Sequence, residues 1–134
     1  MVKLLMVDDD PEQLDELKKI ARRAGIRNVC GATTMLQALD LVRETHFQLA
    51  VIDIVLSELP AKLGLELIST LRAQQPDCKI IALTARGSTD FGVEALLSGA
   101  DDFVSTKWEA ISWSVLLEER LRMWCGVIDG MVRA

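Results

Sequence analysis

Short apolar segments alternate regularly with longer amphipathic segments along this chain, and this alternation restricts the fold more than any other feature. The apolar runs are too short for helices and end at polar residues, which is typical of buried strands. They cover residues 4–7, 29–32, 49–52, 79–83 and 103–104. Strands that are apolar throughout indicate a parallel sheet with helices on both faces. The sequence therefore predicts a doubly wound α/β fold with a five-stranded parallel sheet, because crossovers between parallel strands are right-handed.

The first predicted helix has clear start and stop signals. Asp10 is a favourable N-cap residue, Pro11 suits the first helical position, and Gln13 completes a capping-box pattern three residues after the cap. Gly25 is a natural C-terminal stop. We expect the later helices to begin at Thr33 or Thr34, after Pro60, at Ser88 or Thr89, and at Glu109.

Composition excludes several classes of protein. The chain has 134 residues, 20 acidic and 15 basic side chains, and a formal net charge of −5, which suits one domain. No cluster of Lys and Arg provides the positive surface that direct nucleic-acid binding needs. No apolar run approaches the ~20 residues that span a membrane, and three widely spaced cysteines do not suggest disulfides or a zinc site. We therefore expect a cytoplasmic protein that binds neither nucleic acid directly nor a membrane.

Polar side chains follow four of the predicted strands. Asp8 and Asp9 follow the first strand, and Asp53, Thr84 and Lys107 follow the third, fourth and fifth. Ligands of open α/β sheets bind outside the carboxyl ends of the strands, so we expect these side chains to meet in one crevice. Three close carboxylates repel one another unless a cation lies among them, and oxygen ligands suit Mg²⁺. A hydroxyl and an ammonium group opposite the metal would bind the oxygens of a phosphoryl group.

Each of these side chains also has a purely structural interpretation. Asp9 could favour the dipole of the first helix, Asp53 could be a solvated loop carboxylate, and Thr84 could cap a turn. Lys107 could be an ordinary surface lysine. Their shared position at strand ends and their complementary charges favour a site, whereas we assign Asp10 to helix capping alone.

The same residues resemble a known family. The matching segments, in order, are LLMVDDDP, LAVIDIVLSELP…GLELI, IIALTA and SGADDFVSTK. Together they extend to about residue 108 and resemble the receiver domain of bacterial two-component response regulators, which has a flavodoxin-like fold. By this resemblance Asp53 looks like the phosphoacceptor. The resemblance also implies a Mg²⁺ site formed by Asp8, Asp9, Asp53 and the backbone carbonyl of Val55.

The resemblance assigns further roles around the phosphoryl group. Thr84 looks like the hydroxyl that moves toward it, Phe103 like the aromatic switch, and Lys107 like the lysine that pairs with phosphate. The family receives phosphate from a sensor histidine kinase, a phosphotransfer protein or a small phosphodonor, so we expect an acceptor and not a dedicated enzyme. Val55 and Arg86 occupy positions that flank the approach to the phosphoryl group in that family. An apolar and a long cationic side chain there should hinder or fail to orient the attacking water, which predicts slow self-dephosphorylation.

The chain departs from the family pattern in two places. Ser57 stands four residues after Asp53, where a proline is usual, and the loop that follows is about three residues longer. One additional residue precedes Lys107, and Trp108 follows it where the family has a proline in cis. We expect a trans bond before Trp108, because a cis bond without proline costs ~3–4 kcal/mol. These departures leave an alternative open, a pseudo-receiver that acts through partner binding without phosphorylation.

Two other classes share parts of the pattern. A phosphatase of the haloacid dehalogenase type also has an Asp-x-Asp motif, which residues 8–10 contain. That fold needs its lysine before a later acidic pair, whereas Asp101 and Asp102 precede Lys107 here. A flavodoxin-like FMN site needs a loop rich in Ser, Thr and Gly after the first strand, and the loop here is acidic.

The C-terminal segment exceeds what a receiver needs, so we expect a receiver over residues 1–125 and a helical extension or tail over residues 126–134. Apolar residues at alternating spacings of four and three form a heptad-like stripe. The stripe consists of Leu117, Leu121, Trp124, Ile128 and Met131. We expect Ile111, Val115 and Leu116 to pack on the sheet instead. This arrangement predicts a homodimer or partner interface that contains Trp113, Leu117, Leu121 and Trp124.

Overall fold

The structure of the chain is a computed structural model that describes residues 1–54, 62–84, 89–106 and 112–133. Within these residues, five strands and five helices alternate. Their bounds are β1 (Lys3–Val7), α1 (Pro11–Arg23), β2 (Asn28–Ala32), α2 (Met35–Glu44), β3 (Leu49–Asp53), α3 (Lys62–Gln74), β4 (Lys79–Thr84), α4 (Thr89–Ser98), β5 (Asp102–Ser105) and α5 (Trp113–Arg133). This order confirms the predicted repetition of a strand followed by a helix.

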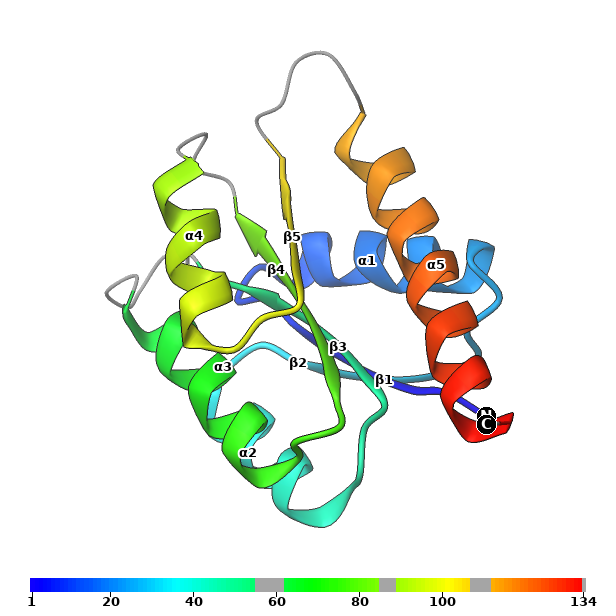
Figure 1. Cartoon of the computed structure of the whole chain (residues 1–134). Helices are drawn as coiled ribbons and strands as arrows, with labels where there is room; N and C mark the ends of the chain where they lie inside the picture. Colours follow the sequence, from blue (N-terminus) through cyan, green and yellow to red (C-terminus); the bar gives the residue numbers. More distant parts are fainter. Residues whose placement is uncertain (55–61, 85–88, 107–111, 134) are drawn as a thin grey trace.

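The strands form one parallel sheet in the order β2-β1-β3-β4-β5, which is typical of flavodoxin-like doubly wound folds. Helices α1 and α5 cover one face of the sheet, and α2, α3 and α4 cover the other (Figure 1). Val7 of β1 is level with Ile52 of β3, and Thr84 of β4 is level with Ser105 of β5. The carboxyl ends of these strands therefore meet at one edge, and the predicted fold class is confirmed.

Both faces of the sheet are apolar. Successive residues of a strand point to opposite faces. Leu5 and Val7 of β1 pack with α2, α3 and α4, whereas Leu4 and Met6 pack with α1 and α5. All four side chains are fully buried. The two cores explain why the strands lack a polar alternation, and they hold the strand ends in fixed positions.

The predicted N-cap residues of the first two helices are confirmed. The side chain of Asp10 accepts a hydrogen bond from the backbone N–H of Glu12 at 3.0 Å. The hydroxyl of Thr34 accepts one from the backbone N–H of Gln37 at 3.1 Å. Gly25 follows α1 with a φ of +90°, a conformation that costs glycine little and other residues more. Local capping chemistry therefore fixes both ends of α1.

The apolar stripe of α5 packs toward the sheet from Leu117 to Ile128, whereas Met131 at its end is 54% exposed. Leu117 and Leu121 have 0% exposure and Ile128 has 7%, and all three pack in the core shared with α1. The prediction that Leu117 and Leu121 belong to an interface is therefore wrong, because the spacing of four and three marks the side of the helix that packs on the sheet. Val115, which we expected to pack there, is 55% exposed.

Helix α5 begins later than predicted and runs unbroken past residue 125, so the expected boundary lies inside one helix. Trp113 and Trp124 are half-buried. The indole Nε1 of Trp124 donates a hydrogen bond to Oδ2 of Asp102 at 3.1 Å, and Arg120 pairs with the same carboxylate. An interface through the two tryptophans stays a prediction. Neither α5 nor any other helix in the described part of the chain is long and apolar enough to cross a membrane.

Candidate functional site

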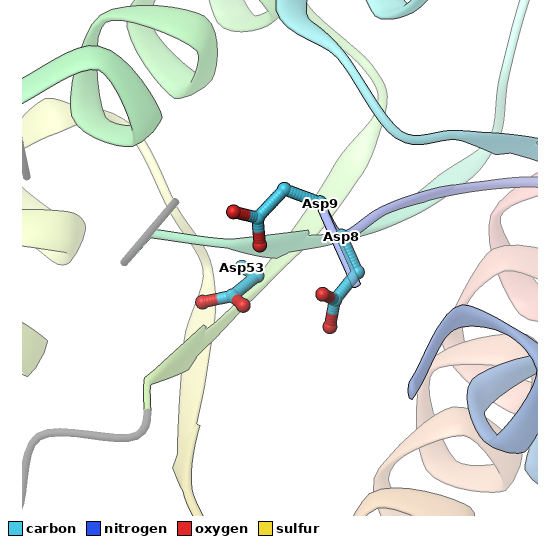
Figure 2. Close-up of side chains that lie close together, drawn as sticks. All are labelled: Asp8, Asp9 and Asp53. Atoms are coloured by element: carbon cyan, nitrogen blue, oxygen red, sulfur yellow. The ribbon is translucent and has the colours of Figure 1, made fainter. Parts of the chain in front are cut away.

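Three carboxylates meet at the carboxyl edge of β1 and β3 (Figure 2). Asp8 and Asp9 directly follow β1, and Asp53 is the last residue of β3. One carboxylate oxygen of each residue lies within 4.8 Å of those of the other two. Asp8 and Asp53 are buried, with 1% and 6% exposure, and Asp9 is half-buried. The structure thus brings together the three acidic residues that the sequence places at strand ends.

Two neutral donors hold the carboxylate of Asp8. Its Oδ1 accepts a hydrogen bond from the backbone N–H of Asp10 at 2.9 Å, and its Oδ2 accepts one from Nε2 of Gln13 at 2.8 Å. Burial raises the pKa of Asp8, and the charges of Asp9 and Asp10 act in the same direction, whereas the two hydrogen bonds lower it. A cation beside Asp8 would offset both the burial and the repulsion.

The three oxygens suit a divalent cation. Hard cations prefer oxygen ligands, and two neighbouring oxygens bound to one octahedral Mg²⁺ at about 2.1 Å lie about 3 Å apart. The observed separations of up to 4.8 Å therefore need only small side-chain movements to close around one ion. Asp8, Asp9 and Asp53 could hold a divalent cation together.

A glycine brings helix α3 against the chain just beyond Asp53. A Cβ on Gly64 would lie 2.5 Å from Cα and 2.7 Å from the carbonyl oxygen of Ile54, so only glycine fits there without a backbone shift. The backbone N–H of Ile54 also donates to the carbonyl oxygen of Leu83 in β4 at 3.0 Å. These contacts fix Ile54, directly after Asp53, between α3 and β4.

Thr84 and Phe103 lie on the face of the sheet that α4 covers. Thr84 ends β4 with 1% exposure, and its carbonyl oxygen accepts a hydrogen bond from the backbone N–H of Thr106 at 2.8 Å. Phe103 lies two residues before Ser105, which is level with Thr84, so strand alternation puts both side chains on one face. A Cβ on Gly92 of α4 would lie 2.5 Å from Cε2 of Phe103, so the phenyl ring rests directly on this glycine.

Several predicted features fall outside the described residues. These are the carbonyl of Val55, the side chains of Arg86 and Lys107, the departure at Ser57, and the peptide bond before Trp108. The described part of the site therefore consists of the acidic cluster, Thr84 and Phe103.

The family model of the response regulator receiver domain matches residues 4–112. This chain belongs to the response regulator receiver domain family. The match includes every strand-end residue of the site. All of α5 lies beyond it.

Relatives of this receiver domain include both short and long proteins. The transcriptional regulatory protein ZraR of Klebsiella oxytoca is 35% identical over 120 residues, which are 90% of this chain and 26% of ZraR. The chemotaxis protein CheY of Listeria monocytogenes is 30% identical over 110 residues, which are 82% of this chain and 90% of CheY. The chain thus spans about a quarter of one relative and nearly all of the other.

One solved relative contains both a phosphorylated aspartic acid and a divalent metal ion. The crystal structure of a response regulator protein from Burkholderia pseudomallei has a phosphorylated aspartic acid, a calcium ion and citrate. It superposes with a TM-score of 0.69 and is 28% identical, and the alignment covers 87% of this chain and 65% of that one. The fold and the function class of this receiver domain therefore match the expectations from its sequence.

Sequence reasoning missed three residues that shape the site, namely Gln13, Gly64 and Gly92. Gln13 carried a signal, the capping-box pattern, but the pattern pointed to the wrong partner. The only sequence signal at Gly64 and Gly92 is the presence of a glycine in a helix, which lowers helix stability by about 1 kcal/mol relative to alanine. Such a glycine often marks a close approach by another segment.

Proposed function

We propose that Asp53 of this receiver domain accepts a phosphoryl group in a Mg²⁺-dependent reaction, and that phosphorylation switches a protein-interaction surface. The convergence of Asp8, Asp9 and Asp53 at one edge of the sheet carries this proposal. The phosphorylated aspartic acid and the calcium ion in the Burkholderia relative support it.

In the proposed reaction, a carboxylate oxygen of Asp53 attacks the phosphorus of a phosphohistidine or of phosphoramidate. An O–P bond forms and the N–P bond breaks, and the leaving nitrogen keeps the electron pair and takes a proton from water. Mg²⁺, when bound, offsets the negative charge of the phosphoryl oxygens. Asp8, Asp9 and the carbonyl of Val55 would hold the ion together with Asp53. A water later removes the phosphoryl group, slowly if Val55 and Arg86 hinder its approach.

The hydroxyl of Thr84 would donate to one phosphoryl oxygen, and Lys107 would pair with another. Movement of Thr84 toward the phosphoryl group would change the space beside Phe103, since both side chains lie on the α4 face of the sheet. Helix α4 exposes three apolar side chains next to this region, Val93 at 52%, Leu96 at 42% and Leu97 at 83%. We propose that Phe103 links the phosphorylation state to this surface.

The proposed phosphodonor is a sensor histidine kinase or a phosphotransfer protein in the cytoplasm, with this chain as acceptor and not as a dedicated enzyme. A homodimer through α5 is a further proposal. The buried stripe residues Leu117, Leu121 and Ile128 cannot form it, so the exposed apolar residues of α5 would do so. These are Val115, Met123, Val127 and Met131, with exposures from 41% to 55%.

The dependence on metal tests the proposal. The protein is incubated with phosphoramidate in Mg²⁺ or in EDTA, and covalent labelling is followed by intact mass. We expect labelling in Mg²⁺ only, and we expect Asp9→Asn to weaken Mg²⁺ binding and labelling together. A pseudo-receiver would gain no mass under either condition, and equal labelling in EDTA would contradict the metal site.

A further inference from the structure

Gln13 contacts the acidic cluster instead of capping its own helix. It is the third residue of α1, where a capping box would direct its side chain back to the N-cap residue Asp10. In the structure, the backbone N–H of Asp10 donates to Asp8 instead. Gln13 Nε2 donates to the other oxygen of Asp8 at 2.8 Å.

Helix α2 also has a glutamine as its third residue, and its side chain makes different hydrogen bonds. Gln37 is the third residue of α2, after the N-cap residue Thr34. Its Oε1 accepts hydrogen bonds from the backbone N–H of Thr33 at 2.9 Å and from the hydroxyl of Thr33 at 3.1 Å. Gln37 therefore stabilises the start of its helix, whereas Gln13 gives its amide donor to a carboxylate.

Neutral hydrogen-bond donors suit a carboxylate that is to bind a metal ion. A carboxylate accepts hydrogen bonds and donates none, and each of its oxygens has two lone pairs. One hydrogen bond to each oxygen therefore orients the group and leaves lone pairs for a metal ion. Asp10 N–H and Gln13 Nε2 are neutral, so they orient the carboxylate without neutralising its charge as a lysine or an arginine would.

We propose that Gln13 is a positioning residue of the Mg²⁺ site, holding the buried carboxylate of Asp8 toward Asp9 and Asp53. This inference rests on the metal site of the proposed function. Residues that hydrogen-bond to metal ligands fix the orientation of those ligands, and their loss typically weakens metal affinity by about 10- to 100-fold. We expect the loss of the Gln13 amide to fall in this range.

The experiment is a calorimetric titration of the full chain with MgCl₂, without any phosphodonor. Gln13→Met keeps the length and helix propensity of the side chain but removes the donor, and Gln13→Asn keeps the amide but shortens its reach. Gln37→Met is the matched control at the same position of α2. Thermal unfolding of each variant in EDTA establishes that it folds without metal.

We expect both Gln13 variants to bind Mg²⁺ about 10-fold more weakly or worse, and Gln37→Met to bind like the wild type. Unchanged or tighter binding by Gln13→Met, with the wild type binding normally, overturns the role of Gln13 alone. A wild type that binds no Mg²⁺ refutes the metal site and Gln13 together. A wild type that binds Mg²⁺ but takes no phosphoryl group refutes only the phosphorylation of Asp53.

Discussion

Replacing Gly92 with alanine should displace the ring of Phe103. A Cβ at position 92 would lie 2.5 Å from Cε2 and 2.6 Å from Cζ of that ring, closer than a van der Waals contact allows. Alanine is favoured over glycine in a helix interior by about 0.5–1 kcal/mol, while overpacking costs about 1–3 kcal/mol. The difference predicts that Gly92→Ala leaves the free energy of unfolding unchanged or lowers it by up to about 2.5 kcal/mol.

Gly126 of α5 provides the matched control, because a Cβ there meets no atom within 4 Å. Gly126→Ala should raise the free energy of unfolding by about 0.5–1 kcal/mol. Urea unfolding followed by circular dichroism measures both variants, alone and in a Phe103→Ala background. The deficit of Gly92→Ala relative to Gly126→Ala should disappear when the ring is removed. If Gly92→Ala stabilises the protein as much as Gly126→Ala does with the ring present, the proposed contact is wrong.

Three further outcomes are expected. Burial raises the pKa of the Cys78 thiol to about 12, so only about one thiol in ten thousand is ionised at pH 8. Iodoacetamide should therefore label Cys78 only in urea, and rapid labelling of Cys78 in the native protein, located by peptide mapping, would contradict its packing. Gly64→Ala should lower the free energy of unfolding by about 1–3 kcal/mol or more, since the new Cβ meets the backbone of Ile54 at 2.5 Å; an unchanged urea midpoint would argue against this. If α5 forms a homodimer, sedimentation should show that the wild type and the control Glu119→Gln are dimers and that Val127→Glu is a monomer. A wild type that stays monomeric at high concentration would exclude the homodimer.

Much of the fold could be predicted from the sequence because its signals are local. The apolar runs predicted each strand, and the caps Asp10 and Thr34 predicted the starts of α1 and α2. The convergence of Asp8 and Asp53 followed from topology, since parallel neighbouring strands end at one edge. These inferences needed the order of elements along the chain and no knowledge of distant contacts.

The features that sequence reasoning missed depend on which of several possible partners a side chain contacts in the folded chain. The stripe with Leu117 and Leu121 shows which residues of α5 share a side, but spacing alone does not say whether that side meets the sheet or a partner. The side chain of Gln13 has two possible partners, the backbone N–H of Asp10 as a donor and the carboxylate of Asp8 as an acceptor, and the sequence pattern does not choose between them. The contact between Gly92 and Phe103 joins α4 to β5 and has no local sequence signature.

Phosphorylation of Asp53 is the central claim, and intact mass measures it most directly. The wild type is incubated with Mg²⁺ and phosphoramidate beside Asp53→Asn and the control Asp40→Asn, which changes an exposed aspartate of α2. We predict that the wild type and Asp40→Asn each gain about 80 Da, the mass of one phosphoryl group in place of a proton, while Asp53→Asn gains nothing. An equal gain by Asp53→Asn would contradict the assignment, and so would a wild type that binds Mg²⁺ but stays unlabelled.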